Sequence, residues 1–404
     1  MKRTIAIALV AAAVILGACG NDADVISASS SDDIAVETAE LIDRDTFRDD
    51  VRALWEDHIA WTRLYIVSAV DGLKDTDVTA ARLLRNQKEI GDAIKPLFGD
   101  EAGNHLTELL NEHILTAADL IAAAKEGDDA AVTKTSKAWY RNGDEIADFL
   151  STAGIAPRAA TREMMKGHLD TTLDEAVARL TGDYEAEIKA YDEVRAHILH
   201  MADALANGII AAMPERFAEE SDSSDAAQIR RDVRALWEDH IVWTRLFIVS
   251  AVDGLADIDV TAARLLRNQT EIGDAIKPIF GDEAGTELTR LLNEHILIAA
   301  DLIRVAKAGD DAAVTKTSKA WYRNGNEIAD FLATAGVGPR AALRDMMKVH
   351  LDTTLAEAVA RLTGDHEAEI EAYDAVRTHI LHMADALAEG LAAVRTSADA
   401  TYDY

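Results

Sequence analysis

The chain has 404 residues, of which 49% are hydrophobic and 28% are charged. This balance is typical of a globular protein, and it excludes both global disorder and a polytopic membrane protein. Asp and Glu number 72 against 41 Lys and Arg, so the net charge of -31 repels phosphates, and nucleic acid is not expected as a partner. The single cysteine excludes an intramolecular disulfide, a zinc ribbon and an iron–sulfur cluster.

The N-terminus has the pattern of a secretion signal. A basic start is followed by an apolar stretch and then by Leu-Gly-Ala-Cys at 16–19, which resembles a lipobox. The resemblance implies that residues 1–18 are a lipoprotein signal peptide and that Cys19 is lipidated, with a plain secretory signal or an uncleaved anchor as alternatives. The expected location is therefore the bacterial cell envelope, outside the cytoplasm, with the chain anchored to a membrane by lipid. Residues 19–46 are predicted to be a flexible tether.

The rest of the chain is duplicated. The sequence VRALWEDHI begins at Val51 and recurs at Val233, and most positions stay identical in this register up to about Gly208 and Gly390. A repeat of this length indicates two copies of one domain. The predicted organisation is repeat 1 (47–213), a linker (214–228), repeat 2 (229–395) and a C-terminal tail (396–404).

Each repeat is predicted to contain six helices. Gly-Asp pairs at 99–100, 127–128 and 182–183 supply a residue that ends one helix and a cap for the next. Apolar residues recur at steps of three and four, and no alternating pattern predicts a strand. The predicted helices of repeat 1 are about 47–72, 77–97, 101–126, 128–151, 158–181 and 183–212. The predicted fold is all-α, with two tandem antiparallel up-and-down bundles of about six helices each.

Four histidines in each repeat lie on apolar stripes near the middle of predicted helices. They are His58, His113, His168 and His197 in repeat 1 and His240, His295, His350 and His379 in repeat 2. Mid-helix positions share one layer of an antiparallel bundle, so these imidazoles are expected to converge. Glu175 and Glu357 share a helix face with the third histidine of each repeat.

This pattern leaves two interpretations open. Facing helices fix ligand geometry, so the first is a site in each repeat for a divalent transition metal: Zn, Cu, Ni or Fe. The second is a hydrogen-bonded polar layer that specifies helix register. The Glu-x-x-His pair of di-iron bundles is missing from these histidines. Tyr184 of repeat 1 is replaced by His366 in repeat 2, so this histidine is not expected in a site common to both.

Three motifs carry a family resemblance. The chain resembles an uncharacterised group of bacterial all-helical bundle proteins in these motifs: W-x-D-H-x-x-W-T-R from Trp55, N-Q-x-x-I-G from Asn86 and H-I-x-x-M-A-D from His197. The resemblance spans nearly all of each repeat, but it implies no activity. No phosphate loop, dinucleotide fingerprint or serine-nucleophile motif is present, so no catalytic residue is assigned. The first functional hypothesis is a metal-binding envelope lipoprotein, and the alternative is a structural or partner-binding one.

Overall fold

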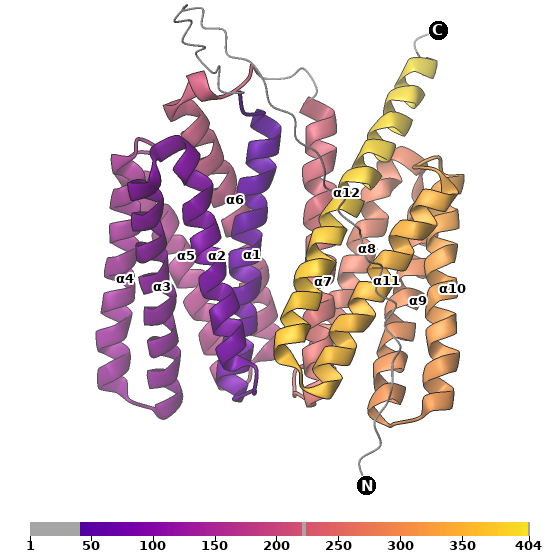
Figure 1. Cartoon of the computed structure of the whole chain (residues 1–404), viewed down its shortest axis with the longest axis horizontal. Helices are drawn as coiled ribbons and strands as arrows, with labels where there is room; N and C mark the ends of the chain where they lie inside the picture. The colour runs from indigo at the N-terminus through magenta and orange to yellow at the C-terminus, as the bar shows by residue number, and fades with distance from the viewer. Residues whose placement is uncertain (1–40, 220–223, 403–404) are drawn as a thin grey trace, which may run out of the picture. The chain divides into compact units, whose positions relative to one another are not determined.

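The computed structural model describes residues 41–219 and 224–402, which belong to one compact unit. In the described residues the chain forms twelve α-helices and one short 3₁₀ turn, and its only β-pairing is an isolated bridge. The helices form two bundles, α1–α6 and α7–α12, which can be followed in Figure 1. The sequence-based prediction of an all-α fold with two tandem six-helix bundles is confirmed.

Bundle 1 consists of α1–α6 and bundle 2 of α7–α12. The helices of bundle 1 are α1 (Arg44–Asp71), α2 (Thr76–Phe98), α3 (Asp100–Glu126), α4 (Asp129–Thr152), α5 (Arg158–Thr181) and α6 (Tyr184–Ala212). The 3₁₀ turn η1 (Pro214–Arg216) follows. Those of bundle 2 are α7 (Ser224–Asp253), α8 (Ile258–Phe280), α9 (Asp282–Lys307), α10 (Asp311–Thr334), α11 (Arg340–Thr363) and α12 (His366–Tyr402). In each bundle every helix packs on its chain neighbours, and the last helix packs on the first.

Helix boundaries differ from the predictions mainly at the ends of the bundles. Helix α1 begins at Arg44, earlier than expected, because the Asp43 carboxylate accepts a hydrogen bond from the Thr46 N–H at 2.8 Å and caps the helix. Helix α7 begins inside the predicted linker. Helix α12 continues through most of the predicted tail, because Thr396 stands where repeat 1 has the helix-ending Pro214.

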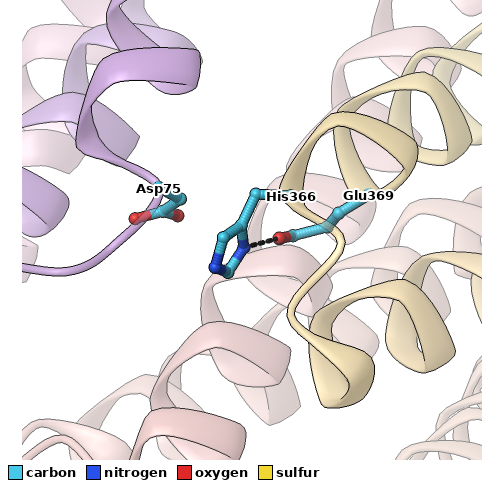
Figure 2. A group of neighbouring side chains, drawn as sticks. All are labelled: Asp75, His366 and Glu369. Carbon is cyan, nitrogen blue, oxygen red and sulfur yellow. Dashed lines mark hydrogen bonds and ion pairs between the residues drawn. The ribbon is translucent and has the colours of Figure 1, made fainter.

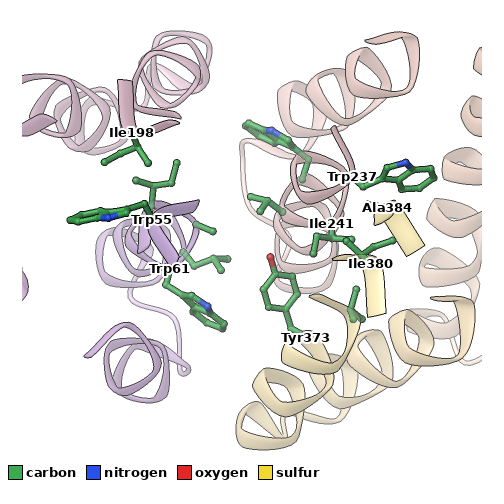
Figure 3. Packing of buried hydrophobic residues seen from close by; sticks show 14 of the residues in the cluster. Trp55, Trp61, Ile198, Trp237, Ile241, Tyr373, Ile380 and Ala384 are labelled. Carbon is green, nitrogen blue, oxygen red and sulfur yellow. The ribbon is translucent and has the colours of Figure 1, made fainter. Parts of the chain in front are cut away.

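The two bundles meet in contacts that occur twice with the roles exchanged. The Trp61 ring packs edge-on against Tyr373 at 5.6 Å between centroids, and Tyr191 packs in the same way against Trp243 at 5.7 Å. Figure 3 shows Trp61 and Tyr373 facing each other, while Trp55 and Ile198 pack together. Two ion pairs across the interface follow the same rule: Arg82 with Asp374, and Arg264 with Asp192. The repeats are therefore related by an approximate two-fold exchange.

Candidate ligand cavities and histidine clusters

Three of the four predicted histidines of each repeat lie together. In bundle 1, His58 of α1, His113 of α3 and His168 of α5 are all almost fully buried. The His168 ring centroid lies 5.6 Å from that of His58 and 5.9 Å from that of His113. The corresponding distances among His240, His295 and His350 of bundle 2 are 5.7 and 6.2 Å. The cluster is thus a feature of both copies.

Side-chain amides hold two of these rings. Gln87 Nε2 donates toward His58 Nδ1 at 3.2 Å, and His113 Nδ1 donates to Asn142 Oδ1 at 3.0 Å. The Asn142 amide also donates to the Leu109 carbonyl, which fixes the orientation of its oxygen. In contrast, His168 Nδ1 is buried and has no hydrogen-bond partner. The third histidine therefore retains an unused polar atom at the centre of the bundle.

Burial keeps the clustered imidazoles neutral. It lowers the pKa of His58 to about 3 and of His113 to about 4, and it lowers the pKa of His168 well below its ordinary value. The neighbouring imidazoles add a smaller lowering effect on the pKa values of His58 and His168. At neutral pH the cluster is uncharged, so it offers either metal-ligating nitrogens or hydrogen-bonding groups for a neutral molecule.

The remaining predicted site residues lie elsewhere. His197 Nε2 is 2.9 Å from the Met164 carbonyl oxygen at a partly exposed position, and His379 lies in the same way near Met346. Glu175 accepts from Arg63 Nη1 at 3.0 Å. It follows His168 by two helical turns, which is about 10 Å along the axis and places it in another layer.

Glu357 has the same role in bundle 2, where it accepts from Arg245 at 3.0 Å. Each of these glutamates thus belongs to a buried ion-pair network and not to a histidine cluster. Burial raises the pKa of Glu175 and of Glu357 to about 7, against the lowering effect of the arginine.

An apolar cavity of about 110 Å³ adjoins the histidine cluster in bundle 2, where all three histidines line it. Bundle 1 has a cavity of the same volume. Every position that lines the cavity of bundle 1 also lines that of bundle 2, and no carboxylate, lysine, arginine or thiol lines either one. The lining of the bundle 1 cavity includes Thr62, Ile114, Trp139, Thr172, Ala176 and Val177. We call these two spaces the interior cavities.

The interior cavities contain polar atoms that lack partners. Trp139 Nε1 and Thr172 Oγ1 line the bundle 1 cavity, are buried, and make no hydrogen bond. The buried atoms that line the bundle 2 cavity and make no hydrogen bond are Trp321 Nε1, His350 Nδ1 and Thr354 Oγ1. Leaving a buried polar group unpaired costs about 1–3 kcal/mol. Because the same atoms are unpaired in both copies, they form a reproducible set of hydrogen-bonding positions within an apolar space.

A separate acidic group lies between the bundles. In the part of the chain that the structure describes, Asp75, His366 and Glu369 are the one group of three possible metal ligands whose ligand atoms all lie within 4.8 Å of one another (Figure 2). His366 Nδ1 is 3.0 Å from Glu369 Oε2. However, the buried Arg361 guanidinium donates to both Asp75 and Glu369. A fixed cation thus already compensates these carboxylates, and the group is an ion-pair network.

Sequence reasoning missed the interior cavities and the residues that line them. Trp139 and Thr172 lie on apolar helix faces and look like ordinary core residues in the sequence. The available signal was the run of small residues, such as Ala117, Ala124 and Ala176, on the faces that meet around the cavity. Small residues on facing helices leave space that larger ones would fill.

Comparison of the chain with protein-family models, with curated proteins and with solved structures found no match. Among the described residues, none of the helices combines the length and the hydropathy needed to cross a bilayer. The function is therefore inferred from the geometry of the two bundles.

Proposed function

We propose that this protein is a non-catalytic binding protein whose two bundles each hold one small, uncharged and mostly apolar molecule. The observation that carries this proposal is the recurrence of the interior cavity in both copies, with unpaired polar atoms at Trp139 and Thr172 and at their counterparts Trp321 and Thr354. Because the two copies are largely identical in sequence, the recurrence shows that the cavity is a property of the domain, and the unpaired polar atoms are the groups that a ligand would contact.

The lining determines the chemistry of the ligand. Apolar walls such as Ile114 favour burial of hydrocarbon at about 25 cal/mol per Å². A charged group would be buried without a partner, at a large cost in free energy. An indole Nε1–H only donates, so it requires an acceptor such as a carbonyl or hydroxyl oxygen on the ligand. The ligand is therefore neutral and carries at least one oxygen acceptor.

The dimensions of the cavity set the size of the buried part of the ligand. Its volume of about 110 Å³ is close to that of an engineered apolar cavity of about 150 Å³ that binds benzene. Val177 lines the cavity and is nearly half exposed, so it marks the side where the cavity meets solvent. One ring or a short hydrocarbon chain fits inside the cavity. Any longer part of the ligand extends into solvent beside Val177.

The test uses three compounds of similar size. Acetophenone has a carbonyl acceptor, ethylbenzene lacks it, and benzoate adds a charge. Titration of the full chain, followed by tryptophan fluorescence and calorimetry, is expected to show two acetophenone sites per chain. Benzoate is expected to bind more than about tenfold more weakly, because its charge would be desolvated.

Matched variants assign these sites. Ala176→Leu fills the cavity of bundle 1 and Ala358→Leu that of bundle 2, so each is expected to remove one site while the other remains. Absence of acetophenone binding, or binding that survives both substitutions together, contradicts the proposal. Equal affinity for acetophenone and ethylbenzene would show that the unpaired polar atoms have no part in recognition.

A transition metal at the three-histidine cluster is the second candidate function. It is favoured by the neutral imidazoles and by the unpartnered His168 Nδ1. The ligand atoms of the three histidines are not all within 4.8 Å of one another, so the rings would have to turn to reach Zn–N distances of about 2.0–2.1 Å. Bound Zn, Cu, Ni or Fe is measured after desalting, together with the melting temperature, in the full chain and in His113→Ala. Absence of retained metal and of thermal stabilisation with all four ions rejects this candidate.

We further propose that the protein acts in the bacterial cell envelope, tethered through lipid on Cys19. Both Cys19 and the predicted signal peptide lie outside the described residues. The supporting observation is the lipobox-like sequence at 16–19. Cys19→Ala is expected to release the protein from membranes or to leave an unprocessed precursor. A mature N-terminus that is unblocked and located elsewhere contradicts the proposal.

A further inference from the structure

Bundle 2 has an apolar groove of about 280 Å³ at one end, separate from its interior cavity. It lies where α7 begins and where α8, α10 and α12 approach their C-terminal ends. Its walls include Ile229, Leu236, Ile276, Ile279 and Leu391, and its rim includes Asp232 and Arg395. We call this space the end groove.

The equivalent end of bundle 1 is covered by a segment of the chain itself. Phe217 is buried, and its ring packs edge-on against Phe47, 5.0 Å between centroids. Phe47 occupies the position of Ile229 in the end groove. Arg216 donates to the Pro96 carbonyl at 3.2 Å, and Pro96 corresponds to Pro278, which also lines the end groove. The chain after α6 thus places an Arg-Phe pair on this surface.

This covering segment is extended. Phe217 has φ -116° and ψ 145°, and it pairs with Ile42 as an isolated parallel bridge. The Ile42 N–H donates to the Arg216 carbonyl at 3.0 Å, and the Ala218 N–H donates to the Ile42 carbonyl at 2.9 Å. An extended backbone with one aromatic anchor is therefore the ligand that this surface binds in bundle 1.

Within residues 41–219 and 224–402, bundle 2 has no corresponding segment, because α12 continues as a helix past Thr396 to Tyr402 (Figure 1). Asp399 stands at the position equivalent to Phe217. Ile279 is only partly buried, whereas its counterpart Leu97 is buried. The same surface is thus covered in bundle 1, whereas no segment of the described residues covers it in bundle 2.

We propose that the end groove of bundle 2 binds an extended segment of a partner protein that carries an arginine followed by a phenylalanine. The phenylalanine packs on Ile229, as Phe217 packs on Phe47 in bundle 1, and the arginine donates to the Pro278 carbonyl, as Arg216 donates to Pro96. Arg395 stands at the rim where repeat 1 has Met213, and it is about half exposed. An acidic residue of the partner segment, next to the phenylalanine, therefore adds charge complementarity. In bundle 1 the backbone of the covering segment pairs with Ile42, whose counterpart Ser224 begins helix α7, so recognition in bundle 2 depends on the aromatic anchor and on the arginine.

The probe is a synthetic peptide with the sequence of residues 213–219, Met-Pro-Glu-Arg-Phe-Ala-Glu. Calorimetric titration of the full chain is expected to show one site. The peptide with Phe217→Ala is expected to bind at least about tenfold more weakly, because it lacks the buried anchor. Ala275→Arg places a long charged side chain in the open end groove and should abolish binding. Ala93→Arg is the matched change in bundle 1 and should leave the site intact.

A second variant tests the equivalence of the two ends. In the full chain, Phe217→Ala removes the anchor that covers bundle 1, so the number of peptide sites is expected to rise from one to two. Absence of binding to the unchanged protein, or binding that is insensitive to Ala275→Arg, overturns the proposal. A count that stays at one in a folded Phe217→Ala chain overturns the assignment of Phe217 as the occupant of the bundle 1 surface.

Discussion

The last helix of bundle 1 ends before Pro214, and Phe217 covers the end of that bundle, whereas α12 of bundle 2 continues to Tyr402 and no described segment covers the equivalent surface. The interiors of the two bundles show no such difference. Both contain three buried histidines, a cavity with equivalent lining, and the same unpaired polar atoms. The comparison therefore separates a property of the domain, which is the interior cavity, from a property of one copy, which is the exposed end.

The shared interior is expected to respond equally to matched substitutions. Arg63 is fully buried, pairs with Glu175 and Glu187, and lies 4.9 Å from the Trp243 ring across the interface. Arg245 has the equivalent partners in bundle 2. Removing one partner of a buried ion pair costs about 3–5 kcal/mol, so Arg63→Met and Arg245→Met are both expected to lower the free energy of unfolding by this amount.

Urea denaturation of the full chain measures this effect. Lys166→Met is the control, because the Lys166–Asp170 pair is exposed, and its loss is expected to cost less than about 1 kcal/mol. If either arginine substitution behaves like the control, that network does not stabilise the fold. A large difference between Arg63→Met and Arg245→Met would show that the bundles are not energetically equivalent.

The histidine clusters make stability fall in acid. The pKa of His113 is lowered by burial to about 4, whereas an unfolded histidine titrates near 6.5. Between these values the unfolded state binds the proton more readily, so the contribution of His113 to stability is complete above pH 6.5 and decreases as the pH falls toward 4. The loss is on the order of 3 kcal/mol for this residue. The pKa of His295 is lowered to the same value, so bundle 2 should behave alike.

Two buried glutamates act in the opposite direction. Burial raises the pKa values of Glu175 and Glu357 to about 7, so the stability linked to their protonated form is present below about pH 4.5 and is lost as the pH rises toward 7. Each bundle has three clustered histidines and one such glutamate, so the effect of the histidines is expected to be the larger and stability to fall in acid. The measurement is the urea midpoint from pH 7 to 4, where His113→Phe and His295→Phe are each expected to reduce the decrease. A variant with the same pH dependence as the parent would contradict the assignment of a buried neutral histidine.

The fold was predictable because helix ends carry local signals. Gly-Asp pairs and apolar spacing located the six helices of each repeat, and the depth of the histidines along the helices predicted the convergence of His58, His113 and His168. His197 has the same depth along its helix but lies outside the cluster, because its ring turns to the Met164 carbonyl at a partly exposed position. The burial of Arg63 depends on Glu175, 112 residues away, and no local pattern indicates that pairing. The interior cavities depend on side-chain volume across five helices, which periodicity does not measure.

The smallest expected effect concerns the residue that most clearly distinguishes the two copies at the interface. In bundle 1 the Arg179 guanidinium lies over the Tyr184 ring at 5.0 Å, and in bundle 2 His366 takes the place of that tyrosine beside Arg361. His366→Tyr is expected to change the free energy of unfolding by no more than about 1–2 kcal/mol, because a cation–π contact with the buried Arg361 replaces the hydrogen bond to Glu369. Zinc is expected to give no stabilisation to either protein, because Arg361 already compensates Asp75 and Glu369. Thermal melts with and without zinc, with Tyr184→His as the reciprocal variant, measure both quantities. Zinc stabilisation that is present in the parent and lost in His366→Tyr would instead identify Asp75, His366 and Glu369 as a metal centre that bundle 1 lacks.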